Sequence, residues 1–298
     1  MKIAYLSYAV ANSYDEPMLA AAKSVATKAG NVSITVFDAN NSQATQLNQL
    51  QTAASSQQYN VIIVQPIFGT GLITSVQAAI KSGVKVVNLD QTMGPDLTTA
   101  EPQVAGLSGN VVKVPSADGT HMGQLVVMAC KAKNLNPCNV GFLGNLAGSS
   151  LDVAVRAAFD AAIKADPTVK VVSTGYAQFT SAGGLKATQT MLQADPSINL
   201  LVGSDQAIEG ATQTVDPKKI VLVGWGGSST GLKDTASGLW FGTVANVPAS
   251  EGLIATQCAI DAIREGTNCG GINPALNLPD QGIITQSNVA KFTAQFVG

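Results

Sequence analysis

Side chains that commonly carry out catalysis are scarce in this sequence. The single histidine, His121, falls in a segment of helical periodicity next to Met122, which favours a structural role over that of a catalytic base. With His121 set aside, triads of serine or cysteine with histidine have no base. Paired acids could hydrolyse glycosides, but Asp15, Asp90 and Asp205 lie on separate segments that no spacing relates. We therefore expect that the chain is not an enzyme.

Three glycine-containing loops match known motifs only in part. Gly69-Thr-Gly71, with Asp90 further along, resembles a dinucleotide fingerprint, but Thr74 replaces the third glycine and the turn after the strand is too long. The loop 144–150 lacks the lysine of a phosphate-binding loop. In segment 106–109 the second glycine comes one residue too early for a nucleophile elbow. We expect no cofactor, and a nucleotide-dependent oxidoreductase is the least favoured alternative.

Charge is unusually sparse. Charged residues make up 12% of the chain, about half of the ~25% usual for soluble proteins. The net charge is −2, and Arg156 and Arg264 are the only arginines, so the sequence has no basic stripe for a nucleic-acid partner. A hydrophobic fraction of 46% and a mean hydropathy of +0.21 indicate a folded chain. Apolar runs such as 61–64 have the length of strands and are far short of the ~18 residues of a membrane span.

The four cysteines leave two interpretations open. The spacing pairs Cys130 with Cys138 and Cys258 with Cys269, although four cysteines allow three connectivities. The alternative is four buried, reduced thiols. The absence of any CxxC motif argues against a structural zinc site, and we expect no metal. Disulfides would imply an oxidising compartment, so we expect an exported protein whose targeting segment has been removed from this chain.

Short runs rich in valine and isoleucine alternate with segments of helical periodicity. This alternation predicts parallel sheets with helices on both faces, and two series of strands predict two doubly wound α/β domains. Strands are expected at residues 2–7, 32–37, 61–64, 85–89, 103–107, 139–143, 169–175, 200–203, 220–224 and 241–245. Helices are expected at residues 16–29, 42–57, 70–82, 118–132, 149–164, 180–193, 205–215, 228–237 and 249–265.

Ligands of open parallel sheets bind beyond the carboxyl ends of the strands. The residues that follow the expected strands are polar or aromatic, and none is basic or a histidine. The candidate ligand-binding residues are Asn12, Tyr14, Asp15, Gln65, Asp90, Gln91, Ser108, Ser149, Asp152, Phe179, Asp205, Trp225 and Asn246. Amide and carboxylate groups among aromatic rings are suited to a ligand rich in hydroxyl groups.

Several segments, in their order and spacing, resemble the periplasmic sugar-binding proteins of ABC importers, of the ribose-binding type (periplasmic binding protein type I). The resemblance covers nearly the whole chain and is carried by residues 2–7, 12–14, 39–42, 61–66, 84–90, 108–110, 204–205, 223–225 and 243–246. It implies two lobes that close on a sugar and deliver it to a membrane permease. It also implies a monomer that works outside the cytoplasm, in the periplasm or at the cell surface, with or without a lipid anchor.

The resemblance also implies roles for individual residues. In the first lobe, Asn12 would form hydrogen bonds with the ligand, and Tyr14 would stack on it. The Gln65 amide would contact ligand hydroxyls, and Asp90 would bind two neighbouring hydroxyls. In the second lobe, Phe179 would be the aromatic residue against the ligand, and Ser204 or Asp205, with Asn246, would complete the ring of polar groups around it.

The sequence departs from this family where the family places charge. Gln91 stands where the family has an arginine, and Asp152 or Val153 stands at its second arginine. The aspartate of the Gly-Phe-Asp segment is replaced within Trp225-Gly226-Gly227. We therefore expect a neutral ligand, either a monosaccharide or an acyclic sugar alcohol, with a cationic amino sugar as the alternative.

Lobe one is expected to contain residues 1–107 and 248–277, and lobe two residues 108–247 and 278–298. A three-segment hinge is expected near residues 107–110, 246–247 and 277–279. Each expected disulfide lies within one lobe. The same fold forms the effector-binding core of sugar-responsive transcription repressors, which is the main alternative. Such repressors carry an N-terminal helix-turn-helix, whereas here the strand pattern begins at Lys2.

Overall fold

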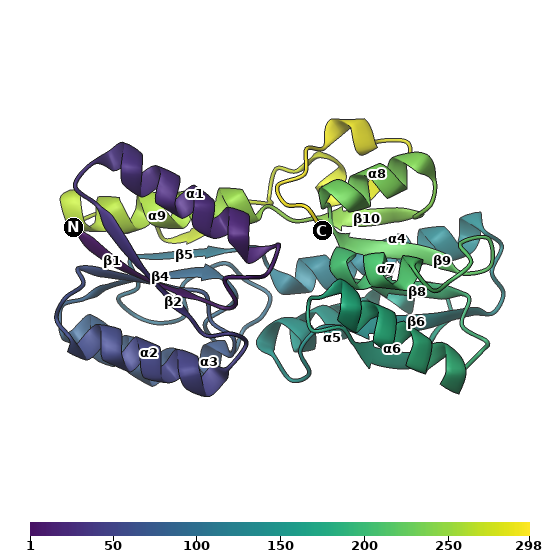
Figure 1. Cartoon of the computed structure of the whole chain (residues 1–298), viewed down its shortest axis with the longest axis horizontal. Coiled ribbons are helices and arrows are strands. Elements are labelled where there is room, and N and C mark those ends of the chain that lie inside the picture. Colours follow the sequence, from purple (N-terminus) through teal and green to yellow (C-terminus); the bar gives the residue numbers. More distant parts are fainter. The chain divides into compact units, whose positions relative to one another are not determined.

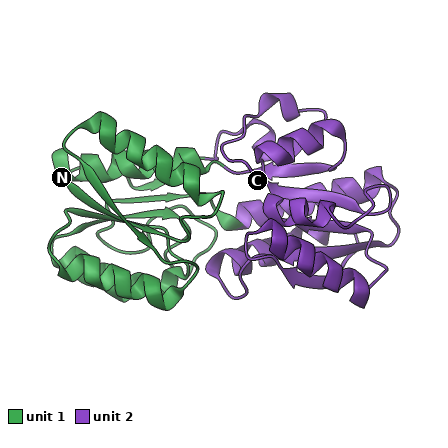
Figure 2. Ribbon diagram, viewed as in Figure 1, with its two compact units in different colours: residues 1–115, 247–274 green, residues 116–246, 275–298 purple.

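A computed structural model describes all 298 residues and divides into two compact units. Unit 1 comprises residues 1–115 and 247–274, and unit 2 comprises residues 116–246 and 275–298 (Figure 2). The chain therefore passes from one unit to the other three times. Each unit is an α/β sandwich with its own sheet, as the alternating sequence pattern predicts.

Unit 1 is built on a six-stranded sheet in the order β11-β5-β4-β3-β1-β2, and all of its strands are parallel. The strands are β1 (Lys2–Ser7), β2 (Ser33–Asp38), β3 (Val61–Val64), β4 (Lys85–Asp90), β5 (Gly109–Val112) and β11 (Gly271–Ile272). The helices are α1 (Asp15–Ala29), α2 (Gln43–Ser55), α3 (Gly69–Lys81) and α9 (Pro248–Arg264). Helices α1 and α9 cover one face of the sheet, and α2 and α3 cover the other (Figure 1).

Unit 2 has a six-stranded sheet in the order β12-β10-β9-β8-β6-β7, in which only β12 runs antiparallel. The strands are β6 (Cys138–Gly144), β7 (Val169–Tyr176), β8 (Leu200–Gly203), β9 (Val221–Gly226), β10 (Gly242–Ala245) and β12 (Ile283–Thr285). The helices are α4 (Pro115–Ala132), α5 (Ser150–Ile163), α6 (Ser181–Ala194), α7 (Asp205–Thr212) and α8 (Ser229–Ser237), with short 3-10 turns at Pro279–Gly282 and Val289–Lys291. One core lies under α4 and α5, and a second lies under α6 and α7.

The expected strand at residues 103–107 is wrong. These residues form turns, and the fifth strand is β5, at Gly109–Val112. Gly106 has a φ of 86°, which breaks an extended run. Val104 and Leu107 are nevertheless buried, because their side chains pack in the core between the sheet and helices α2 and α3.

Because β5 pairs with β4, residues 108–115 lie with unit 1, whereas the sequence analysis assigns them to the other lobe. The last passage between the units comes at residues 274–275, three residues before the expected boundary. The very short β11 and β12 are too brief to produce a periodic pattern, so the sequence does not reveal them.

The helices begin and end within three residues of their expected bounds. Serine or threonine caps explain this accuracy: the side chains of Ser42, Ser149, Thr180, Ser204 and Ser228 each accept a hydrogen bond from a backbone N–H in the first turn. None of the helices combines the length and apolar character that crossing a bilayer requires.

Helices α1 and α9 cross at Gly252. A Cβ atom at this position would meet the carbonyl oxygen of Met18 far inside van der Waals contact, so glycine allows the two backbones to touch. The neighbouring residue, Glu251, is thereby carried to the start of α1. This close crossing sets the position of one side of the candidate site.

We expect Gly252→Ala to lower the free energy of unfolding by about 2 kcal/mol or more, since overpacking forces helices apart. Leu253→Ala is the control, because Leu253 is half exposed on the same helix and its truncation should cost less than about 1 kcal/mol. Urea unfolding of the two variants measures the difference. Equal destabilisation by both would contradict the close crossing.

Both expected disulfides are present, Cys130–Cys138 in unit 2 and Cys258–Cys269 in unit 1, and no cysteine is free. Cys130 lies in the last turn of α4 and Cys138 is the first residue of β6, so their bond links the helix to the strand that follows it. Cys258 lies on the buried face of α9.

Replacing both cysteines of either pair by serine should lower stability by about 2 to 3 kcal/mol, because each bond closes a short loop in the unfolded chain. Chemical unfolding of each double variant provides the measurement, and peptide mapping of the non-reduced protein checks the pairing. Recovery of linked peptides in any other combination would refute the assignment.

Candidate functional site

The candidate site in unit 1 lies where β1, β3 and β4 end. Tyr14 caps α1 and Asp15 is its first residue. Gln65 follows β3, Asp90 ends β4, and Gln91 comes next. Because neighbouring parallel strands end at the same edge of a sheet, these five predicted binding residues gather in one cluster. They are joined by hydrogen bonds within the unit.

Gln65 is the centre of the cluster. Its amide nitrogen donates to Asp15 Oδ1 at 2.6 Å and to Asp90 Oδ2 at 2.9 Å. Its amide oxygen accepts from the backbone N–H of Tyr8 at 3.0 Å. Gln46 of α2, which the sequence analysis did not identify, fixes the Gln65 backbone by donating to its carbonyl oxygen at 2.7 Å. The Gln65 amide is therefore fully engaged and held rigidly between two carboxyl groups.

Asp90 occupies a strained turn. Its φ is 65°, and the N–H of Gln91 donates to the carbonyl of Leu89 across it at 2.7 Å. A non-glycine residue in this region is uncommon, and such strain is concentrated at functional sites. Asn88 supports the turn by donating to the Gln91 carbonyl at 2.7 Å, and the Gln91 side chain donates to Asp90 Oδ2 at 2.8 Å.

Glu251 is a further member of the cluster and is not among the residues expected from the sequence. It lies in the first turn of α9 and is completely buried. The Tyr14 hydroxyl lies 3.2 Å from Asp90 Oδ1 and 3.3 Å from Glu251 Oε2. Helical spacing could have indicated that Glu251 is buried, since it shares the buried face of α9 with Ala255 and Cys258, but not which residues it contacts.

Burial dominates the electrostatics of this cluster. It raises the pKa of Asp15 from 3.8 to about 8, although the hydrogen bond from Gln65 opposes the shift. Burial also raises the pKa of Asp90 and raises that of Glu251 well above its ordinary value. The phenol of Tyr5, buried beneath the three carboxyls, has a raised pKa for the same reason, reinforced by their charges. The folded protein therefore retains protons here that the unfolded chain would release.

Unit 2 brings Ser149 and Asp152 together at the start of α5. The Ser149 hydroxyl accepts from the Asp152 N–H at 3.2 Å, and Asp152 Oδ2 accepts from the N–H of Asn145 at 2.7 Å. Asn145 in turn accepts a hydrogen bond from Ser204 at 2.8 Å. Burial raises the pKa of Asp152 to about 6. Asn145 was not among the candidate residues, although it follows β6 directly.

Asp205 is enclosed on all sides. Its Oδ2 accepts from the N–H and hydroxyl of Ser228 at 2.8 and 2.7 Å, and its Oδ1 accepts from Thr243 at 2.7 Å. Glycines of β9 and α8 pack directly against the carboxylate. Burial raises its pKa to about 6. Through these hydrogen bonds Asp205 connects α7 with β10 and with the start of α8. Its expected role in ligand binding stays a prediction.

The remaining candidates lie at separate places. In unit 1, Asn12 accepts from the Tyr14 N–H at 2.8 Å, and Ser108 is buried with its hydroxyl unpartnered. In unit 2, Phe179 has a φ of 53° and packs against the core under α4 and α5. Trp225 is the second-last residue of β9 and has a buried, unpartnered indole N–H, and Asn246 follows β10.

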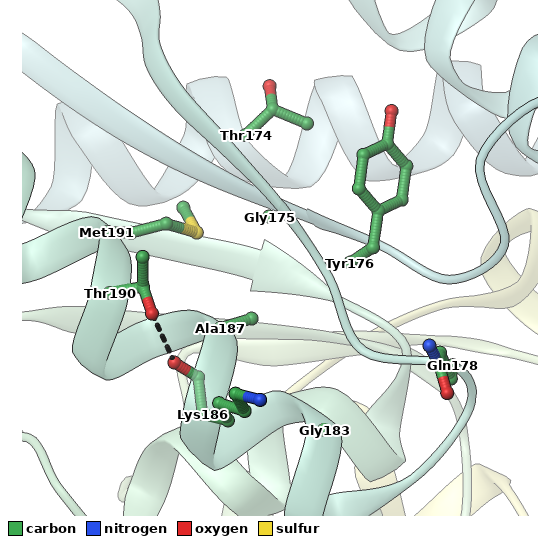
Figure 3. Close-up of a pocket in the computed structure, with 9 residues that line it drawn as sticks. All are labelled: Thr174, Gly175, Tyr176, Gln178, Gly183, Lys186, Ala187, Thr190 and Met191. Carbon is green, nitrogen blue, oxygen red and sulfur yellow. Dashed lines mark hydrogen bonds between the residues drawn. The ribbon is translucent and has the colours of Figure 1, made fainter.

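Unit 2 also contains a pocket of about 380 Å³ between β7 and α6 (Figure 3). It is lined by Thr174, Gly175, Tyr176, Gln178, Gly183, Lys186, Ala187, Thr190 and Met191. Tyr176 is half exposed, and Thr190 donates back to its own helix at Lys186. None of the candidate residues lines this pocket, and it lacks the buried carboxyls of the unit 1 cluster.

Asp15→Asn tests the electrostatics of that cluster. Because its pKa is raised to about 8 in the folded state, Asp15 makes stability fall as pH rises from about 4 to about 8, by at most about 1.4 kcal/mol per pH unit. Asp15→Asn should remove this contribution and so give a shallower fall in stability, whereas Glu16→Gln, on the exposed side of α1, should keep the wild-type slope. Urea unfolding at several pH values measures the slopes. Parallel slopes for wild type and Asp15→Asn would contradict the assignment.

The comparisons with known proteins agree with this architecture. The family model described as "Periplasmic binding protein domain" matches residues 3–267. The ribose import binding protein of Bacillus subtilis (strain 168) is 24% identical over 78% of this chain and 72% of its own, and the D-allose-binding periplasmic protein of Escherichia coli (strain K12) is 25% identical over 73% and 70%.

Solved structures share the fold. A galactofuranose binding protein has a TM-score of 0.84 at 19% identity, covering 98% of this chain and 96% of the other, and the Caulobacter myo-inositol binding protein has a TM-score of 0.83 at 20% identity with the same coverage. The fold class and the family resemblance expected from the sequence are confirmed. The chain belongs to the periplasmic binding protein family, and as a member of it is a binding protein and not an enzyme.

Proposed function

We propose that this chain is the solute-binding protein of an ABC importer and captures a neutral monosaccharide or sugar alcohol. The observation that carries the proposal is the buried cluster at the strand ends of unit 1. There Asp90 supplies acceptor oxygens, and Gln91 supplies an amide beside them. Hydroxyl groups both donate and accept, so carboxylate and amide groups in a fixed arrangement match a polyol.

Asp90 has an exchangeable position for such a ligand. Its Oδ2 is occupied by the two glutamine amides at 2.8 and 2.9 Å. Its Oδ1 receives the Tyr14 hydroxyl at 3.2 Å, which is long for a hydrogen bond between oxygens. A ligand hydroxyl that binds at the usual, shorter distance can replace Tyr14 there. The phenol ring would then be available to cover the C–H face of the ligand.

The ligands for which related proteins are named support a neutral compound. Relatives and structural neighbours are named for ribose, D-allose, galactofuranose and myo-inositol, and one solute-binding protein from Mycobacterium smegmatis carries glycerol. All of these are uncharged and rich in hydroxyls. The twelve-per-cent charge content of the chain and its near absence of arginine favour the same class.

Capture would occur by lobe closure, with units 1 and 2 as the lobes and bending at the three connections near residues 115–116, 246–247 and 274–275. The closed, monomeric form would then deliver the ligand to a membrane permease. Two disulfides suit an extracytoplasmic location, whether the mature protein diffuses freely or carries a lipid anchor.

A thermal-shift screen over monosaccharides, sugar alcohols and amino sugars tests the proposal. We expect a neutral polyol to raise the melting temperature, since a ligand at about 100 times its Kd adds about 2.7 kcal/mol of stability. Asp90→Asn should weaken its affinity by about tenfold or more, because it removes a charged acceptor. Calorimetric titration measures that change.

Asp96→Asn is the matched control, since it makes the same change in an exposed loop of unit 1 and should leave affinity unaltered. Stabilisation by amino sugars alone would shift the ligand class to the cationic alternative. If no compound of the three classes stabilises the protein, or if Asp90→Asn binds as tightly as wild type, the proposal fails.

A further inference from the structure

Glu251 is a fully buried acid on a helix whose buried face is otherwise made of apolar and small residues and one threonine. Burying an ionised carboxylate without an ionic partner costs several kcal/mol, so such groups are usually paired or neutral. One of its oxygens, Oε1, has no hydrogen-bond partner at all. Its other oxygen has one donor, the Tyr14 hydroxyl, at a long 3.3 Å and shared with Asp90, so hydrogen bonds do little to stabilise a negative charge on Glu251.

The other oxygen, Oε2, lies beside the hydroxyl of Tyr14. This one hydroxyl is 3.3 Å from Glu251 Oε2 and 3.2 Å from Asp90 Oδ1, so it lies between the two carboxyl groups. An ionised carboxylate can only accept hydrogen bonds. A single hydroxyl proton cannot satisfy two buried anions, so a further proton on one of the two carboxyl groups removes the repulsion between them.

The donors decide which acid carries that proton. Asp90 receives the amides of Gln65 and Gln91, which stabilise its anion, whereas the single hydroxyl proton of Tyr14 lies at nearly equal distance from both acids. Glu251 receives no amide. Burial, and after it the charge of Asp90, raises the pKa of Glu251, and the ammonium of Lys113 opposes this shift only in part. Glu251 is thus the neutral member of the pair.

The groups that face Glu251 from the surrounding elements give the charge of the cluster. Tyr5 of β1 stays neutral, and Asp15 of α1, with its pKa of about 8, is largely protonated at pH 7. Asp90 of β4 carries the negative charge, and Lys113, after β5, carries a positive one. With Glu251 neutral, the cluster has a net charge close to zero, although it contains three acids and one base.

We propose that Glu251, as a neutral carboxylic acid, is a positioning residue that donates a hydrogen bond to Asp90 and makes the site select neutral over cationic polyols. This inference rests on the proposed function for its ligand. Its structural half, the proton on Glu251, can be measured without any ligand.

The first test compares unliganded wild type with Glu251→Gln, which keeps a donor to Asp90 and cannot ionise. A retained proton makes wild-type stability fall, relative to the variant, as pH rises from about 5 to about 9. The comparison cancels the contribution of Asp15, which both proteins contain. Thermal unfolding over this range gives the difference, and pH profiles that run parallel would overturn the proposal whether or not a ligand is known.

The second test uses D-sorbitol, its 1-amino-1-deoxy analogue and any neutral polyol found in the thermal-shift screen, titrated at about pH 7. Glu251→Gln should bind the neutral polyol within about threefold of wild type, and Glu251→Leu, which has no donor, should bind it about tenfold more weakly. Between about pH 7 and pH 9 Asp15 ionises in both proteins, whereas Glu251 can ionise only in wild type, so neutral-over-cationic selectivity should fall further in wild type than in Glu251→Gln.

Equal affinities of Glu251→Leu and wild type would overturn the positioning role. If Glu251→Leu does not fold, the pH dependence of selectivity in wild type and Glu251→Gln still decides, because a purely structural role would not make it differ. If wild type binds none of the compounds while its pH profile differs from that of Glu251→Gln, the proposed function fails and the proton on Glu251 stands.

Discussion

The arrangement of unit 1 depends on one amide group placed between two buried carboxyls. The Gln65 nitrogen donates to both Asp15 and Asp90. Without this amide the two carboxyl groups would be buried next to each other in the low-dielectric interior with no donor between them. β3 positions Gln65 in the middle of the sheet, and Gln46 fixes its backbone. The strained turn at Asp90 and the start of α1 are arranged around this amide, and Tyr14 connects Asp90 to Glu251 of α9.

Unit 2 uses the same residue type differently. Asp90 and Asp205 both stand where a strand of a parallel sheet ends and a loop or helix begins. Asp205 is saturated by short hydrogen bonds from Ser228 and Thr243, which tie three elements together. Asp90 has one long contact, with Tyr14. The two carboxylates thus differ in the number and length of their local donors rather than in their position in the fold, and under the proposed function the long contact is the one that a ligand replaces.

The sequence allows the alternation of strands and helices, the helix caps, the disulfide pairing and the residues at the strand ends to be predicted, because each depends on local pattern or on the geometry of parallel sheets. The cluster of Tyr14, Asp15, Gln65, Asp90 and Gln91 follows from that geometry. The strand predicted at residues 103–107 is wrong because apolar side chains there are buried under the sheet although their backbone forms turns and pairs with no strand.

Glu251 could not be placed with this cluster from the sequence because it comes from a helix more than 150 residues away from Asp90, and only the close crossing at Gly252 brings it there. The saturation of Asp205 is likewise a property of three distant segments. Such cross-element contacts decide which acids are charged, so the charge of the site is a tertiary property.

A crystal structure of the protein with a stabilising neutral polyol tests the central claim most directly. The account predicts ligand hydroxyls within hydrogen-bond distance of Asp90 Oδ1 and the Gln91 amide, with the Tyr14 hydroxyl displaced from Asp90. A polyol bound instead in the pocket between β7 and α6, with the hydrogen bonds of Asp90 unchanged, would contradict it.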